Sequence, residues 1–161
     1  MKKIFAIVVL ALVSVAALAQ SGRDIYNKYS DEAGVSSVYI SPAMFRLIGR
    51  LPDVSFEDSE VNFSSIIKSM SGFYIVNSEN PDIADGLYSD VKRYIKKGDF
   101  ELLMEAKDDG QVMRMYTAGD EKTVSSFIMI VRDEAEVSFI SFDGNMDREE
   151  LEVLIAEAAA D

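Results

Sequence analysis

Three residue types with distinctive chemistry are missing, because the sequence has no cysteine, no histidine and no tryptophan. Without cysteine there is no disulfide and no thiol nucleophile, and without histidine there is no Ser-His-Asp triad. Zinc and copper sites built on His or Cys side chains are excluded for the same reason. The sequence also lacks a glycine-rich loop of the kind that binds phosphate groups. We therefore assign no catalytic residue, no cofactor and no metal ligand from the sequence.

Basic residues are scarce, since 16 Lys and Arg stand against 28 Asp and Glu, and the net charge is −12. Nucleic-acid binding depends on clustered Lys and Arg that neutralise phosphate groups. Docking on anionic lipid depends on the same residue types. The composition therefore argues against nucleic acid and against an anionic membrane surface as partners.

The N-terminal segment has the layout of a secretory signal peptide. Two lysines precede an apolar run, residues 4–18, that is interrupted only by Ser14. This run is shorter than the roughly 20 residues that a membrane-spanning helix needs. The small-x-small pattern at residues 17–19 predicts cleavage between Ala19 and Gln20.

Removal of a signal peptide 1–19 would leave 161 − 19 = 142 residues, a length that suits one domain spanning 20–161. Lipid attachment at the new N-terminus would need a cysteine, so we expect a protein that is not lipidated. No later stretch is long and apolar enough to predict a transmembrane segment. We therefore expect a single acidic domain that works outside the cytoplasm.

Hydrophobic periodicity predicts alternating helices and strands, followed by a run of strands. The helix predicted at residues 80–97 is the best defined, because Asn80-Pro81 is a helix start signal and Gly98 is a helix stop signal. Asp147 is the predicted N-cap of the last helix, with Glu150 in the position of a capping-box partner. The predicted helices are 24–33, 41–51, 63–70, 80–97 and one after residue 147, and the predicted strands are 35–40, 71–77 and four within 100–143.

The sequence fixes the register of one hairpin. Asp109-Gly110 is a strong two-residue turn signal, and placing it at the tip pairs Ala106 with Met113 and Glu105 with Arg114. This register collects apolar side chains on one face of the hairpin and charged side chains on the other. The apolar set is Phe100, Leu102, Met104, Ala106, Met113 and Met115, and the charged set is Glu101, Glu105, Lys107 and Arg114.

Hairpin-linked strands and separate helices predict an α+β fold: a mainly antiparallel sheet with helices packed on one face, as a two-layer sandwich. We expect the apolar hairpin face to meet the helices, so that Met104, Met113, Met115 and Met129 pack in the core. The alternative for these methionines is an adaptable binding surface. The face left open would then carry Leu103, Val112 and Tyr116, which we take as the candidate interaction surface.

Carboxylate clusters offer weaker signals. Glu57, Asp58 and Glu60 form an acidic segment within residues 53–61. This segment could hold a hard cation, but a solvated loop is the better explanation of its composition. Asp108 and Asp109 lie at an exposed hairpin tip, which lacks the burial that tunes a catalytic acid. Neither cluster predicts an active site.

Four blocks of the sequence occur together and in the same order in a known family: residues 28–41 (KYSDEAGVSSVYIS), 43–45 (AMF), 107–110 (KDDG) and 140–147 (ISFDGNMD). On these blocks the chain resembles DUF4252, a domain-of-unknown-function family of small exported Bacteroidota proteins. The resemblance implies a signal peptide, one domain and a Gram-negative envelope setting. The protein would then be periplasmic or secreted. It implies no catalytic residue, cofactor or substrate.

Three functions fit these observations. The first is a non-enzymatic periplasmic binding or accessory module whose partner is a protein or small ligand of the cell envelope. The second is a carboxylate-dependent hydrolase of an envelope polymer, which would need two acidic groups facing each other across a cleft. The third is a structural or oligomerising envelope protein.

Overall fold

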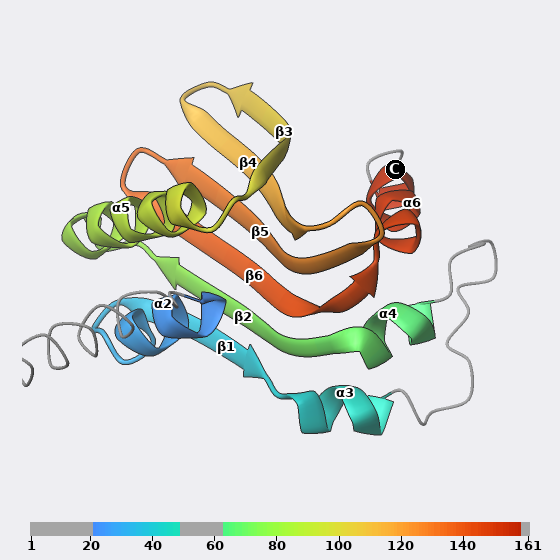
Figure 1. Cartoon of the computed structure of the whole chain (residues 1–161). Coiled ribbons are helices and arrows are strands. Elements are labelled where there is room, and N and C mark those ends of the chain that lie inside the picture. The colour runs from blue at the N-terminus through green and yellow to red at the C-terminus, as the bar shows by residue number, and fades with distance from the viewer. Residues whose placement is uncertain (1–20, 49–62, 159–161) are drawn as a thin grey trace, which may run out of the picture.

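The computed structural model of the chain describes residues 21–48 and 63–158. Within these residues the protein is built on one six-stranded sheet in which every neighbouring pair is antiparallel (Figure 1). The strands lie in the order β1-β2-β6-β5-β4-β3. Their bounds are β1 Val35–Ile40, β2 Met70–Ser78, β3 Glu101–Asp108, β4 Gln111–Gly119, β5 Thr123–Asp133 and β6 Glu136–Asp147.

Five helices accompany this sheet in the described part of the chain: α2 Gly22–Tyr29, α3 Pro42–Ile48, α4 Phe63–Ser69, α5 Pro81–Lys97 and α6 Arg148–Ala158. The α+β class and the antiparallel sheet are therefore confirmed. None of these helices has both the length and the apolarity needed to cross a bilayer. The predicted cleavage site at Ala19–Gln20 and the acidic segment 53–61 lie outside the described residues.

The predicted hairpin is present with the predicted register. Ala106 pairs with Met113, Glu105 with Arg114, and Met104 with Met115. The turn residues Asp109 and Gly110 have φ values of 40° and 90°, the left-handed conformation that a two-residue hairpin turn requires. Near the other end of β3 the register shifts between Leu102 and Met104, which places a bulge at Leu103.

The main core lies between the sheet and the pair α2 and α5. Asn80 caps α5 by accepting a hydrogen bond from Asp82 N, and the apolar stripe of the helix then faces the strands. The helix residues Leu87 and Val91 are fully buried against Val76 and Phe139 of the central strands. We call the sheet face beneath α2 and α5 the helix face.

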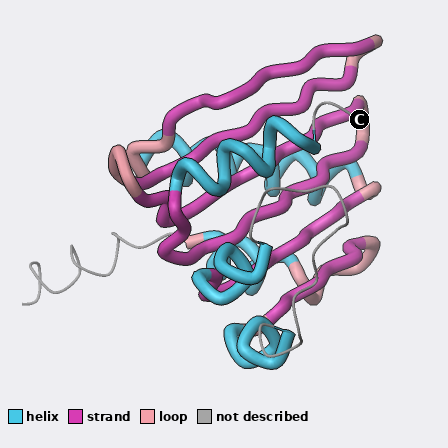
Figure 2. The backbone as a smooth tube through the Cα atoms, turned by 90° about the vertical axis from the view of Figure 1, so that its right-hand side faces the viewer, coloured by secondary structure: helices cyan, strands magenta, loops and turns pink. Residues whose placement is uncertain are grey.

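A smaller core lies at one end of the opposite face, where α4 and α6 pack. It consists of Ile66 of α4, Val124, Met146 and Leu151 of α6, with Phe142 packed against it. Phe142 and Phe139 are three residues apart on a regular stretch of β6, so they point to opposite faces of the sheet. Figure 1 accordingly shows α2 and α5 on one side of the sheet and α4 and α6 on the other, and Figure 2 shows the helix that leads to the C-terminus in front of the strands.

The expectation that the helices all lie on one face therefore holds for α2 and α5 but not for α4 and α6. The expectation that the hairpin methionines face the main helix layer is wrong. Arg114 of the charged hairpin face donates to Tyr88 Oη of α5 at 2.8 Å, so the charged face is the one that meets α5. The methionine face is the opposite one.

Candidate functional site

The residues expected on the open face do not form one surface. Tyr116 packs against the main core on the helix face, and burial raises the pKa of its hydroxyl. Val112 pairs with Lys107 and Arg132, and the Arg132 side chain reaches Asp85 of α5, so Val112 is also on the helix face. The placement of Val112 and Tyr116 on an open face is thus wrong, and only Leu103, 39% exposed at the β3 bulge, is a surface residue.

The face opposite α5 carries an uncharged row that crosses the whole sheet. Residues directly paired on neighbouring antiparallel strands point to the same face, and the pairing joins one apolar residue from every strand into this row. In spatial order the row is Val38, Ile75, Ile140, Met129, Met115 and Met104.

A second row lies beside the first, one step nearer to the β3–β4 turn. Its members are Ser36, Asn77, Ser138, Val131, Met113 and Ala106, and none of them is charged. We call the apolar centre of the two rows the methionine patch, which we define as Met104, Met113, Met115, Met129, Val131 and Ile140.

Side chains on the same strands are buried to different extents on the two faces of the sheet. On the helix face Ile128, Ile130 and Phe139 are 0–2% exposed. Every member of the methionine patch is instead only half-buried, although it lies on the same strands. Among the described side chains, the small core under α4 and α6 lies at the far end of this face and contains no member of the patch, so each patch residue keeps part of its surface exposed.

Six carboxylates lie along the end of the sheet that borders the patch, at the β3–β4 turn, at the β5–β6 turn and just after β2. The pairs Asp108–Gln111 and Asp133–Glu136 close the two hairpins at this end. None of the six takes part in an ion pair with any residue that the structure describes. We call this set the acidic end, and its members are Glu79, Asp108, Asp109, Asp133, Glu134 and Glu136.

Basic residues near the acidic end are already engaged elsewhere. Lys107 forms an ion pair with Glu105 at 2.8 Å, and Arg132 pairs with Asp85 at 2.6 Å. Both belong to the helix face, away from the patch. The border of the methionine patch therefore has negative charge that the described residues do not neutralise.

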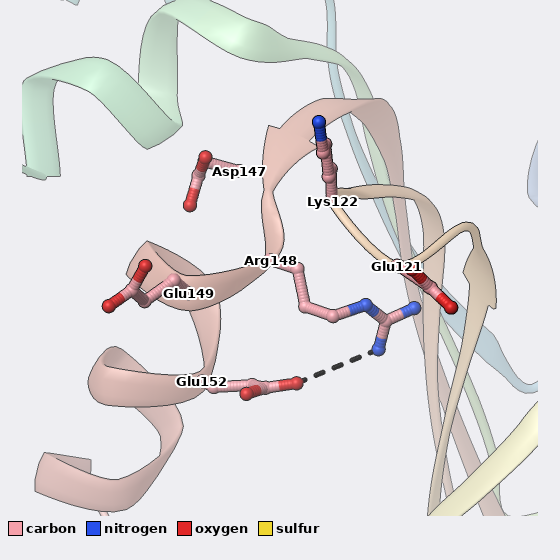
Figure 3. A pocket seen from close by; sticks show the side chains of 6 residues that line it. All are labelled: Glu121, Lys122, Asp147, Arg148, Glu149 and Glu152. Atoms are coloured by element: carbon pink, nitrogen blue, oxygen red, sulfur yellow. Dashed lines mark ion pairs between the residues drawn. The ribbon is translucent and has the colours of Figure 1, made fainter.

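The opposite end of the sheet holds a shallow pocket with both signs of charge (Figure 3). Asp147 is the N-cap of α6, as predicted, because its Oδ1 accepts from Glu150 N at 3.1 Å. Arg148 is used within the pocket, where its Nε donates to the Asp120 carbonyl at 2.9 Å and its Nη1 lies 3.7 Å from Glu152 Oε1. The pocket is lined by Glu121, Lys122, Asp147, Arg148, Glu149 and Glu152, and no group of three potential metal ligands occurs among the described residues.

Two carboxyl groups lie on the helix face, Asp90 buried and Asp143 half-buried, and no sequence motif marked either as a site. Asp90 of α5 is 5% exposed and accepts hydrogen bonds from Lys28, Tyr29 and Arg93. It lies inside the apolar stripe of α5, between Leu87 and Tyr94, and a charge in that stripe is the signal that could have revealed it. These contacts tie α2 to α5.

Asp143 of β6 is half-buried, and Ser126 Oγ donates to it at 2.8 Å. Burial raises the pKa of Asp143, and burial also raises the pKa of the neighbouring Tyr94 hydroxyl to about 12. Both groups are therefore held in their neutral forms more readily than in water. Asp143 belongs to the helix face, away from the carboxylates of the charged pocket.

A comparison with family models finds that the model for DUF4252, described as a domain of unknown function, matches residues 29–154. This range includes every strand of the sheet and most of α6. No curated protein and no solved structure matches the chain.

Proposed function

We propose, from the premise that this chain belongs to the DUF4252 family, that it is a non-enzymatic module which binds a partner through its methionine patch. The observation that carries the proposal is the uncharged row across all six strands, exposed at Val38 and half-buried at its other members, on the face opposite a fully buried core. The transfer of apolar surface out of water lowers the free energy by about 25 cal/mol per Å². An accessible apolar patch on a strongly acidic chain is therefore best explained by a partner that covers it.

The site of action that we propose is the space outside the cytoplasm. The charged start, the apolar run and the small residues before Gln20 support export. The absence of cysteine supports a chain that carries no lipid. Mass spectrometry of the protein purified from a Gram-negative host should find Gln20 as the first residue. A product that begins at Met1 in the cytoplasmic fraction would contradict this part of the proposal.

The carboxylate hydrolase is the weaker candidate. A glycoside hydrolase places two carboxyl groups on either side of the scissile bond in a cleft. Asp143, the half-buried carboxyl whose pKa is raised, has Ser126 as its hydrogen-bond donor and faces the α2 and α5 layer. Asp147 caps α6, and Glu152 pairs with Arg148, so two of the four carboxylates of the charged pocket already have structural roles.

Site-specific photo-crosslinking in the native envelope tests the proposal. A photoreactive residue placed at Met115, inside the patch, should form a covalent adduct with the partner. The matched control is Met44 on α3, which is 47% exposed and lies outside the patch, and it should give no such adduct. Equal crosslinking from both positions would contradict a specific site. An adduct of twice the chain mass from Met115 would favour the structural or oligomerising alternative.

A further inference from the structure

We infer that the partner of the methionine patch is a single amphipathic helix whose apolar stripe is bordered by Lys or Arg. This inference rests on the proposed function and names the chemistry of the partner. Three independent properties of the surface support it: its shape, its charge and its side-chain type.

The shape of the accessible surface matches one helix. The two uncharged rows, which include the patch on β3 to β6, cross six strands spaced about 4.8 Å apart and so extend over about 29 Å, and their spacing of about 7 Å gives a depth of about 14 Å. The area is then on the order of 400 Å², below the roughly 800 Å² per partner of a standard stable dimer. A helix of about 18 residues is about 27 Å long and about 10 Å wide. One helix lying across the strands would therefore cover the patch.

The charge around the patch differs between its two flanks. On one flank lie Asp108, Asp133 and Glu136, none of them in an ion pair with a described residue. On the other flank lie α4 and α6, whose neighbourhood has both Lys122 and Arg148 beside carboxylates. A helix across the strands would have one long side against the carboxylates alone. Lys or Arg on that side of the helix would be attracted, and Asp or Glu would be repelled.

The side chains of the patch suit a helix with an irregular apolar stripe. Methionine is unbranched and polarizable, so it adapts to partners of different shape. Four of the six patch residues are methionines that lie on adjacent strands, with Met115 directly paired to both Met104 and Met129. Such surfaces bind amphipathic helices whose exact sequence varies, provided that apolar residues recur at helical spacing.

The same charges disfavour the other two occupants of an apolar face. A second copy of the chain would bring a net charge of −12 against an equal charge. An anionic lipid surface would meet the unpaired carboxylates of the acidic end. Both occupants remain as outcomes of the test below.

Three synthetic helices provide the probes. Each has about 18 residues with Leu along one face, and the opposite face is Lys in the first, Gln in the second and Glu in the third. Isothermal titration of the full chain should give the tightest binding for the Leu/Lys helix, at least about tenfold tighter than for Leu/Gln, with no binding of Leu/Glu. The preference for Lys should shrink as salt is raised, because exposed charges are screened. Vesicles of anionic lipid should not bind.

Two variants with matched controls locate the binding. Replacing Met113 and Met115 by Gln should abolish binding of both the Leu/Lys and the Leu/Gln helix, while Met44→Gln should change neither. The triple variant Asp108→Asn, Asp133→Asn, Glu136→Gln should lower affinity for Leu/Lys by about tenfold and leave Leu/Gln unchanged. Its control neutralises Glu121, Glu149 and Glu152 at the other end of the sheet and should keep Leu/Lys affinity within about threefold.

The outcomes separate the inference from the proposed function. Binding of Leu/Lys and Leu/Gln with equal affinity, lost in the methionine variant, would overturn the inference and leave the patch as a binding site. Binding that the methionine variant retains, by a protein whose circular dichroism matches the wild type, would overturn both. Concentration-dependent dimerisation that competes with the helices, or binding to the vesicles, would overturn the inference in favour of the other occupant.

Discussion

Asp90 shows how one charged residue holds two helices together. Its carboxylate is 5% exposed, and it accepts hydrogen bonds from Lys28 and Tyr29 of α2 and from Arg93 of its own helix. Lys28 and Arg93 are more than half exposed and can return to water when the partner is removed. The buried Tyr29 hydroxyl cannot, so the loss of its acceptor is the main cost.

Replacement of Asp90 by alanine should therefore lower the free energy of unfolding by about 1–3 kcal/mol, as measured by urea denaturation. The control is Asp85→Ala, because Asp85 is 69% exposed and pairs only with Arg132. An exposed pair of this kind contributes less than about 1 kcal/mol. An equal decrease in the free energy of unfolding in the two variants would show that Asp90 contributes no more than a surface ion pair does.

The contributions of Asp90 and Asp143 to stability should respond to pH in opposite directions. Burial alone raises the pKa of Asp90, but the hydrogen bonds from Lys28 and Tyr29 and the charges of Lys28 and Arg93 outweigh it and hold the pKa below its usual value. Its stabilising contribution is present above the unfolded pKa of about 3.9 and is lost as pH falls through the folded pKa. The pKa of Asp143 is raised by burial, so its contribution is present below the unfolded pKa and is lost as pH rises through the folded pKa.

We accordingly expect Asp143→Asn to raise the free energy of unfolding at about pH 7, since asparagine keeps an acceptor for Ser126 without a buried charge, and to have little effect at about pH 3. Asp90→Asn should lower the free energy of unfolding by more at about pH 7 than at about pH 3, because the contribution of the carboxylate declines below the unfolded pKa. Urea denaturation at the two pH values measures both changes. A stabilisation by Asp143→Asn that is larger at the acidic pH would contradict the assigned direction.

Among the elements, the best predicted ones are those whose signals are local. The register of the β3–β4 hairpin follows from Asp109-Gly110 and from the alternation of its side chains, and the start and end of α5 follow from Asn80-Pro81 and Gly98. The order of the strands could not be predicted in this way. It depends on α5, which connects β2, the second strand from one edge of the sheet, to β3 at the opposite edge, and no local signal sets the length of that crossing.

The face of the hairpin that meets α5 was assigned wrongly for a specific reason. Sorting side chains into apolar and charged sets assumes that the apolar set is the buried one. Glu105 and Arg114 instead neutralise each other at 2.6 Å, and Arg114 also donates to Tyr88 of α5. Long charged side chains that are paired in this way can pack at the border of a helix, so the methionines were left on the other face. The sequence therefore predicted core packing for these methionines, and the binding surface was only the alternative.

Helix α5 gives a prediction about a single cap. Asn80 Oδ1 accepts from Asp82 N at 3.1 Å, so Asn80→Ala should lower the free energy of unfolding by about 1 kcal/mol in thermal or urea denaturation. Glu79→Ala is the matched control, because Glu79 precedes the cap and is exposed. The control should change stability by less than about 0.5 kcal/mol. A similar loss in both variants would argue against a capping role.

At the scale of the whole molecule, the acidic end should weaken the fold rather than support it. Its carboxylates repel one another and have no positive partners among the described residues. The triple variant Asp108→Asn, Asp133→Asn, Glu136→Gln should therefore have a melting temperature equal to or higher than that of the wild type at low salt, and added salt should reduce the difference. A clearly lower melting temperature would show that these residues serve the fold, and would remove the reason to assign them to a partner.

The position of β6 has a consequence for how the chain reaches its native state. This strand is the last to be synthesised, yet it lies between β2 and β5 near the middle of the sheet, and it joins Ser78 to Val137 across a long stretch of chain. A nascent polypeptide that ends before residue 136 lacks the strand that pairs with both β2 and β5, so the β1–β2 ribbon and the β3–β5 meander would be connected only through α5. Contacts between residues distant in the sequence form slowly, because the chain loses the entropy of closing the loop before the contacts can stabilise it. If the chain is exported as we propose, this order would suit it, because a polypeptide that stays open until its final strand emerges can thread through a narrow translocation channel.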